Sequence, residues 1–439
     1  MNHQLSFARV DYALFVLYLA VLLAVSWKTR RTARNSEAEY LLAGRRLTLP
    51  AFIATLVTTW YGGILGVGEY TFLYGISNWL VFGLPYYLAA ILFALFIVKP
   101  ARKNPMLSIP DQLHSAYGRR PALAGAMMVF IMTVPASYVL MLAELLKLFL
   151  GGSLLMWLVL GTLFSTVYVA WGGFRAIVRT DKFQFILMYF GFALLLVMSW
   201  HKFGGLDFLQ NNLPETHFQW HGGLGAPAIL VWYFIAMATL IEPSFYQRVY
   251  AAKSAKTARN GILISIAFWI LFDFMTTFTG LYARAALGPD INPTLSFPLL
   301  ADQLLPPGVK GIFFLALASV IMSTVDSYSF LAAQTLSRDI VGRWRDNLSE
   351  WKVSSIQIGL LVLAIIIAAW KQTVIGIWHD LGSIGIAVLL LPMAGSFRSP
   401  PLFPRRAILP AMVVAGSLTL FWTLFGNYGS GFPLGIQPV

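Results

Sequence analysis

The chain has 439 residues, of which 58% are hydrophobic and 11% are charged, and its formal net charge is +13. With a mean hydropathy of +0.72, this composition is that of an integral membrane protein and excludes a soluble globular one. The chain contains no cysteine, which excludes disulfides, thiolate metal sites and cysteine nucleophiles.

Twelve apolar segments follow one another along the chain and predict about twelve transmembrane helices. Most of them have about the 20 residues that a helix needs to cross roughly 30 Å of hydrocarbon. No stretch between them is long enough for a soluble domain, so we expect one membrane domain to carry the function. The segments lie at 12–27, 50–75, 78–98, 122–150, 154–171, 183–200, 226–246, 260–285, 308–335, 354–370, 373–396 and 406–425.

Most of the 31 lysines and arginines lie in every second loop between these segments. The positive-inside rule places such loops in the cytoplasm, which predicts that both termini are outside. Contact with the anionic surface of the lipid bilayer explains the net charge, and we expect no nucleic-acid partner. The basic loops are 28–46, 99–120, 175–182, 248–259, 338–352 and 398–406.

Two of the apolar segments are interrupted by residues that weaken a helix. Segment 50–75 contains the run TTWYGG at 58–63, and segment 226–246 contains Glu242-Pro243 near its inner end. Broken helices at matching points of two halves indicate the central site of a transporter, because freed carbonyls can bind cations there. The second segment begins five predicted helices after the first. This odd number of membrane crossings gives the two segments opposite orientations, which predicts an inverted five-plus-five repeat. Kinks that only improve packing are the alternative.

A polar cluster occupies the middle of the apolar segment 308–335. Ser323, Asp326 and Ser327 share one helical face, and Thr324 lies at its edge. A carboxylate inside a membrane span often marks an ion pathway, and hydroxyl and carboxylate oxygens are suitable ligands for a small alkali cation. In the structural alternative, the hydroxyls bond the preceding helical turn and Asp326 pairs with a neighbouring helix.

Three motifs resemble those of a known transporter family. The run GGFRAIVRTDKFQ at 172–184 is similar to the pattern GG-x-RA-x-x-x-TD-x-x-Q, and QR is followed by AAKS within 247–254. The third motif is MST at 322–324 with RDI at 338–340. With these motifs the chain resembles the sodium:solute symporter family, the relatives of the sodium/glucose and sodium/proline cotransporters, from Tyr40 to about the eleventh helix.

The resemblance implies an all-α, leucine-transporter-like fold. Two inverted five-helix repeats follow one extra N-terminal helix in this fold, and we expect the protein to be a monomer. The implied division is 1–49 for the extra helix and a basic cytoplasmic loop, 50–200 for the first repeat, 201–225 for an outer loop, 226–396 for the second repeat, and 397–439 for the C-terminal helix and a short outer tail.

The resemblance also implies a sodium site between the first broken helix and the polar helix. Alignment with the family places two of its ligands at the backbone carbonyls of Leu56 and Thr59. The remaining ligands are the carbonyl of Val320 and the hydroxyls of Ser323 and Thr324.

A second site, for sodium or for a proton, is implied at Asp181, Asp326 and Ser327. Asp181 matches an acid on the inner sodium route of the family, whereas Asp326 stands where some relatives have a hydroxyl. The alternative for Asp181 is an ion pair at the membrane surface with one of the basic residues of 175–182.

Candidate solute-binding residues lie at both helix breaks: Trp60, Gly63 and Glu69 at the first, and Glu242 at the second. Acids that line a pocket would favour a solute with an amino or other cationic group. The alternative is that the two glutamates cap helices or pair within the bundle. Asp273, in the middle of the eighth apolar segment, has no role that these patterns assign.

The sequence therefore predicts a secondary active transporter that moves a small polar organic solute with sodium across the plasma (inner) membrane by alternating access. Na+ is the expected coupling ion, with no organic cofactor. We expect no enzymatic activity, because the sequence has no nucleophile motif or phosphate-binding loop. A proton-coupled transporter of the same fold and a transport-inactive, sensor-like homologue remain as alternatives.

Overall fold

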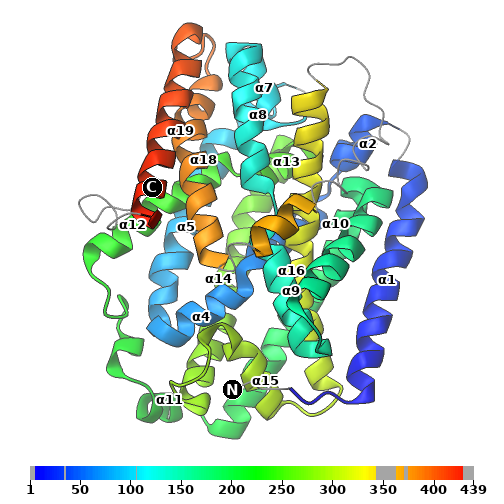
Figure 1. Cartoon of the computed structure of the whole chain (residues 1–439), viewed down its shortest axis with the longest axis vertical. Helices are drawn as coiled ribbons and strands as arrows, with labels where there is room; N and C mark the ends of the chain where they lie inside the picture. The colour runs from blue at the N-terminus through cyan, green and yellow to red at the C-terminus, as the bar shows by residue number, and fades with distance from the viewer. Residues whose placement is uncertain (1–4, 34–35, 105, 343–361, 370–373, 429–439) are drawn as a thin grey trace.

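The computed structural model describes residues 5–33, 36–104, 106–342, 362–369 and 374–428. These residues form a bundle of helices (Figure 1), and the described part of the chain contains no β-strand. The predicted all-α fold is confirmed.

Nine helical stretches of the described chain are long and apolar enough to cross a membrane. They contain ten of the predicted segments, because α10 (Leu154–Phe203) includes two of them, one before and one after a kink at Gly173. The backbone φ of Gly173 is +57°, a value that glycine adopts without strain. The eleventh predicted segment is α18 (Val374–Ser396), whereas the predicted helix at 354–370 lies mostly outside the described residues.

The first predicted break is a 3-10 turn, η2 (Tyr61–Gly63), between α3 (Leu49–Trp60) and α4 (Ile64–Tyr74). It begins later than the predicted run at 58–63, because α3 continues to Trp60. At Gly62 the turn lies so close to α16 that an added Cβ would overlap the side chain of Thr324. Glycine therefore allows the broken helix to pack here.

The second predicted break is η7 (Met237–Ile241), between α12 (Ala226–Ala236) and α13 (Pro243–Ala251). Glu242 follows it with an extended backbone, and its side chain accepts a hydrogen bond from the Ser244 N–H (3.2 Å). Proline fits the first position of a helix, where no N–H donor is needed. The structure thus confirms an interruption in both segments.

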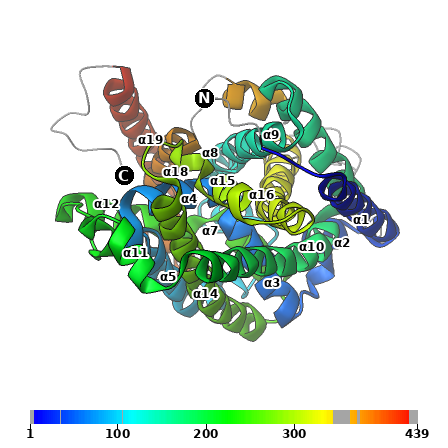
Figure 2. The same cartoon turned by 90° about the horizontal axis from the view of Figure 1, so that it is seen from below.

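α16 (Val309–Gln334) lies in the middle of the bundle against α10, and α3 and α14 (Ala255–Leu287) pack around this pair (Figure 2). Small residues let the two central helices approach closely, and Gly191 of α10 lies against Ala316 of α16. In lipid, such close packing is a main source of helix association, because lipid tails are as apolar as the side chains.

α1 (Arg9–Ala33) lies at one edge of the bundle beside α10, and α19 (Arg405–Tyr428) lies at another edge beside α18 (Figure 2). Asp11 fixes α1 to the bundle. Its Oδ1 accepts hydrogen bonds from the backbone N–H groups of Gly308 (2.7 Å) and Gly311 (2.9 Å). These N–H groups at the start of α16 have no partner within their own helix, so the acid of one helix caps another.

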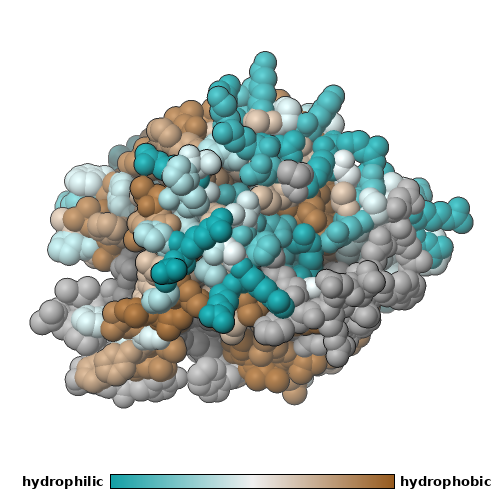
Figure 3. Space-filling view, turned by 90° about the horizontal axis from the view of Figure 1, so that it is seen from above, coloured by the Kyte–Doolittle hydropathy of each residue, from teal (hydrophilic) through white to brown (hydrophobic). Residues whose placement is uncertain are grey.

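The two ends of the bundle carry different short helices. α2 (Glu37–Leu42) and α7 (Ile109–Tyr117) lie at the end that Figure 3 shows, where hydrophilic side chains cover much of the face. The sides expose large apolar residues such as Leu17, Phe96 and Ile186, as expected of a surface that lipid covers. The other helices are α5 (Leu84–Leu92), α6 (Val98–Ala101), α8 (Arg119–Thr133), α9 (Ala136–Leu150), α11 (Leu206–Asn212) and α15 (Ser296–Leu304).

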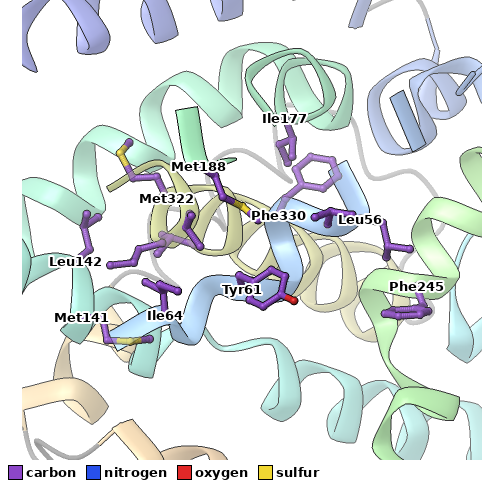
Figure 4. Packing of buried hydrophobic residues seen from close by; sticks show 14 of the residues in the cluster. Leu56, Tyr61, Ile64, Met141, Leu142, Ile177, Met188, Phe245, Met322 and Phe330 are labelled. Atoms are coloured by element: carbon purple, nitrogen blue, oxygen red, sulfur yellow. The ribbon is translucent and has the colours of Figure 1, made fainter. Parts of the chain in front are cut away.

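Apolar side chains of several helices surround the first break (Figure 4). Tyr61, Ile64, Leu142 and Met322 come from η2, α4, α9 and α16, and all four are buried. Figure 4 shows the Tyr61 ring with its hydroxyl oxygen turned away from Ile64. Packing therefore fixes the ring, while the hydroxyl is directed toward a polar partner.

Candidate functional site

The predicted sodium ligands of α16 meet α3 immediately before its break. The Thr324 hydroxyl donates to the carbonyl of Thr59 (2.8 Å) and lies 3.3 Å from the carbonyl of Val320. Leu56 is buried in the unbroken part of α3, about one turn before Thr59. The structure thus brings Thr59, Val320 and Thr324 together between two helices.

Ser323 is the centre of a second group of oxygen atoms. Its hydroxyl donates to Asp181 (2.7 Å) and lies 3.0 Å from the Thr58 hydroxyl. The Thr59 hydroxyl lies 3.2 Å from that of Ser323 and 3.1 Å from that of Ser327. All of these side chains are buried, and together they offer a cation only oxygen ligands. In the described part of the chain, no cluster of His, Asp and Glu side chains could hold a transition metal.

A buried arginine reaches this group from α13. The Nη2 atom of Arg248 donates to the hydroxyls of Thr55 (2.9 Å) and Thr59 (2.7 Å), and also to that of Ser327 (2.9 Å). The same atom lies 3.9 Å from Oδ2 of Asp181, and both side chains are fully buried. An unpaired buried charge is strongly destabilising, so the arginine and the aspartate stabilise each other.

The position of Arg248 differs from the one that the sequence predicts. The charge pattern places it in a cytoplasmic loop at 248–259, and this is wrong, because Arg248 lies inside α13. The surface alternative for Asp181 is also wrong, since its carboxylate is buried beside Arg248. The QR pair at 247–248 was the available signal, but a sequence motif does not show which way a side chain points.

Asp326 has different neighbours from the rest of the predicted second site. It accepts hydrogen bonds from Ser165 and Tyr168 of α10, which is the structural alternative predicted for this residue. Asp181 and Ser327 instead lie together, joined by the buried arginine. A second ion site that uses all three residues therefore stays a prediction.

The two glutamates predicted to bind solute have partners within the protein. Glu242 caps α13 and accepts a hydrogen bond from the Tyr328 hydroxyl (3.0 Å). Glu69 accepts one from the Thr294 hydroxyl (3.3 Å). These contacts are those of the capping and pairing alternative, and a role in solute binding stays a prediction. Gly63 is buried at the end of η2.

Trp60 lies in an aromatic cluster between the two broken helices. Its ring centroid is 5.4 Å from that of Tyr86 on α5 and 5.6 Å from that of Phe245 on α13. A third neighbour, Trp269 on α14, lies 5.2 Å away. The space between two broken helices is where transporters of this architecture place their solute.

Asp273 is buried on α14, beside the first break. The Tyr61 hydroxyl lies 2.9 Å from its Oδ1 atom and 3.0 Å from the carbonyl of Trp269, and Tyr87 of α5 donates to its Oδ2 atom. The carboxylate thus joins three helical elements that are far apart in the sequence. No sequence pattern assigns Asp273 a role, because neither tyrosine is near it along the chain.

Arg338 joins the C-terminal end of α16 to the hydrophilic end of the bundle. It lies on η9 (Thr335–Val341), where its Nε atom is 2.9 Å from Glu37 of α2 and Nη2 is 3.0 Å from Asp111 of α7. Its Nη1 atom lies 2.7 Å from Asp339, which also accepts a hydrogen bond from Ser108 (3.0 Å). These ion pairs hold α2, α7 and the end of α16 together.

Three curated transporters are similar to this chain in sequence. The sodium/pantothenate symporter of Escherichia coli is 27% identical, over 92% of this chain and 88% of the relative. The high-affinity choline transporter 1 of Drosophila melanogaster is 25% identical, over 87% of this chain and 65% of the relative. The human sodium/myo-inositol cotransporter 2 is 25% identical, over 83% of this chain and 61% of the relative. The chain thus spans less than two thirds of the length of the last two.

Two solved structures of transporters have a similar fold. A Na+-coupled sialic acid symporter in a substrate-bound outward-open state matches with a TM-score of 0.79 and 20% identity, over 98% of this chain and 94% of the other. Mhp1, a nucleobase-cation-symport-1 family transporter, matches with a TM-score of 0.57 and 14% identity, over 90% and 96%. At these identities the likeness shows the leucine-transporter-like fold. Residues 40–394 match the model of one family, and the chain belongs to the sodium:solute symporter family.

Proposed function

We propose that this protein is a sodium-coupled secondary transporter that moves a small polar organic solute across the plasma (inner) membrane. One observation carries the proposal: the Thr324 hydroxyl and the Thr59 carbonyl meet at a helix break, beside Ser323 and the buried Asp181. A sodium ion at this point would take its ligands from the same oxygen atoms, including the carbonyls of Val320 and Leu56.

The position of these ligands explains how sodium could control a conformational change. Thr59 belongs to the proposed first repeat at 50–200, and Thr324 belongs to the proposed second repeat at 226–396. An ion held between them binds tightly only when the two repeats have one relative position. Sodium therefore favours that position, because a ligand shifts an equilibrium toward the state that binds it better.

The available energy is sufficient for uptake. One sodium ion that crosses a membrane potential of 100 mV gains about 2.3 kcal/mol, and a tenfold concentration gradient adds about 1.4 kcal/mol. The sum of about 3.7 kcal/mol supports roughly a 500-fold gradient of a neutral solute. One ion per cycle is enough, so the proposal does not depend on the second site at Asp181, Asp326 and Ser327.

Orientation in the membrane is a further part of the proposal. We expect the end with α2 and α7 to face the cytoplasm, which would put the start of α1 outside. The absence of cysteine allows a direct test with Ser6→Cys and Ser36→Cys, since both serines are exposed at opposite ends of α1. A membrane-impermeant maleimide should label only Ser6→Cys in intact cells, and labelling of only Ser36→Cys would contradict this orientation.

Thermal unfolding of the purified protein in sodium chloride and in potassium chloride, at equal ionic strength, tests sodium binding. We expect sodium to raise the unfolding temperature of the native protein but not of Ser323→Ala or Thr324→Val. Ser329→Ala is a matched control, because Ser329 is equally buried on α16 and its hydroxyl has no hydrogen-bond partner.

Two results would contradict the assignment of the sodium site. A sodium effect that survives in both site variants would place the ion elsewhere. No sodium effect in the native protein would contradict sodium coupling and favour proton coupling through Asp181 or Asp326.

A further inference from the structure

The relatives differ in the charge of the solute that their names give. Choline is a cation, pantothenate is an anion and myo-inositol is neutral, so membership of the family does not fix the charge of the solute. The residues around the two helix breaks of this chain must decide it.

The aromatic cluster at these breaks could cover an organic cation. Trp60 contacts Tyr86, Phe245 and Trp269, which come from three further helices. Trp60 and Tyr86 are only partly buried, although both lie within membrane-spanning segments. The faces of aromatic rings attract an ammonium group, and the attraction is larger where water is excluded.

Asp273 lies one helical turn after Trp269 on α14, so the carboxylate and this ring share a helical face. Its two hydroxyl partners, Tyr61 and Tyr87, are the immediate chain neighbours of Trp60 and Tyr86. The link between the carboxylate and the aromatic rings is Trp269, which contacts Trp60 and lies one turn before Asp273. Together they form one wall, built from α3, η2, α5, α13 and α14.

This carboxylate, like that of Asp326, has no cationic partner among the described residues, whereas two other acids of the bundle do. Asp181 pairs with Arg248, and Asp302 pairs with Lys310. For Asp273, no lysine, arginine or histidine of the described residues lies within the 4.0 Å of an ion pair. A carboxylate at such a depth is costly and usually belongs to a functional pathway.

The same wall also has an unused hydrogen-bond donor. The Nε1 atom of Trp269 is buried and has no partner, although a buried indole N–H normally finds one. A solute with both a cationic group and an accepting oxygen would satisfy the carboxylate and the indole together.

We propose that Asp273 is the counter-ion for an ammonium group of the transported solute, and that Trp60, Tyr86, Phe245 and Trp269 form the aromatic wall beside it. This proposal rests on the proposed transport function and adds the chemical class of the solute, a small organic cation. Tyr61 and Tyr87 act as positioning residues, because their hydroxyls hold the carboxylate against the wall.

Ligand-dependent thermal unfolding of the full-length purified protein tests the proposal. The probes are choline, ethanolamine, pantothenate and myo-inositol, each added in sodium chloride, with 3,3-dimethylbutan-1-ol as the uncharged isostere of choline. We expect at least one ammonium probe to raise the unfolding temperature, and we expect no such effect from the isostere, pantothenate or myo-inositol.

Asp273→Asn is the decisive variant, because the amide keeps the size of the side chain and removes its charge. It should weaken binding of the ammonium probe by more than about tenfold, in line with the loss of a charged hydrogen bond. Its response to sodium should be unchanged, which shows that it is folded. Asp290→Asn, an exposed loop residue shortly after α14, is the matched control and should bind the probe as the native protein does.

The outcomes separate this proposal from sodium symport. A response to sodium but to no ammonium probe, or full ammonium binding by Asp273→Asn, would overturn the role of Asp273 and leave sodium coupling supported. A native protein that binds the ammonium probe without any response to sodium would contradict sodium symport and still support the Asp273 site.

Discussion

Asp181 and Asp273 are two buried carboxylates that contact different parts of the first broken segment, α3 and η2, and they are stabilised in different ways. Asp181 lies among hydroxyls and beside the guanidinium of Arg248, so its charge is balanced within the protein. Asp273 has two tyrosine hydroxyls and no described cation. One region is therefore complete with its own residues, whereas the other has an uncompensated charge.

The difference indicates separate roles for the two carboxylates. Around Asp181, a sodium ion has to compete with a resident guanidinium for the same oxygens, so its binding can be coupled to movement of α13. Around Asp273, an incoming cation would meet a carboxylate that has hydroxyl partners but no resident cation among the described residues. We therefore expect the ion and the solute to use different carboxylates, joined by η2.

Removal of Arg248 should give the largest effect. Arg248→Met leaves Asp181 buried without a cation, which we expect to cost about 3–5 kcal/mol of stability. Sodium should recover part of this loss, because the ion can replace the guanidinium charge beside the same oxygens. The measurement is thermal unfolding in sodium chloride and in potassium chloride.

Two companion variants make this prediction specific. Arg259→Met removes an exposed arginine of α14 and should have little effect. The double variant Arg248→Met/Asp181→Asn should be more stable than Arg248→Met alone, because both charges are gone. A double variant that is less stable would contradict the view that Arg248 serves to neutralise Asp181.

Loss of the Tyr87 hydroxyl should affect the region around Asp273. Tyr87→Phe leaves Oδ2 of Asp273 without its donor, which we expect to cost roughly 1.5–3 kcal/mol because the acceptor is charged. The sodium response should remain, since the sodium ligands lie around Thr324 and Ser323. Tyr86→Phe changes the adjacent residue in the same way and should cost less. A lost sodium response in Tyr87→Phe would show that the two regions are not separate.

Gly62→Ala should disturb both regions moderately, because the residue lies in the turn between them. Its Cβ would overlap Thr324, and overpacking of this kind typically costs about 1–3 kcal/mol. We expect a lower unfolding temperature and a weaker response to sodium. Gly225→Ala is the control, since a Cβ there would meet Pro227 only at an ordinary contact distance of 3.7 Å. An unchanged sodium response in Gly62→Ala would place the ion away from this contact.

The helices and their breaks could be predicted because they depend on local sequence. Apolar runs set the spans, and the run at 58–63 and the pair Glu242-Pro243 weaken the helix where they stand. The hydroxyls of Ser323 and Thr324 could be assigned because a family motif contains them. The carbonyl and hydroxyl contacts between α3 and α16 agree with that assignment.

The partners of the charged residues could not be predicted, because they depend on which helices become neighbours. Asp326 and Ser327 are consecutive and lie about 100° apart on the helix, so they face α10 and α3 respectively. The partner of Arg248 also depends on its position in a helix. Its place in α13 directs the side chain into the bundle, although a loop follows this helix. For Asp273 the sequence shows an acid inside a span, but not the two tyrosines that hold it.

The contribution of His217 to the pH dependence of stability should be the smallest of these effects. It belongs to neither Asp181 nor Asp273, so its removal sharpens the comparison of the two carboxylates. His217 lies outside the predicted spans, where its Nε2 atom is 3.0 Å from the carbonyl of Phe72 and its buried Nδ1 atom has no partner. Burial lowers the pKa of His217 below its ordinary value of 6.5, so folding favours the neutral ring. The stability that this provides is complete above pH 6.5 and is lost as the pH falls below it, because the unfolded chain then binds a proton more readily. His217→Gln keeps a side-chain donor for the Phe72 carbonyl and should flatten the decline of the unfolding temperature below pH 6.5. If the decline is equally steep in the variant, His217 is not its cause.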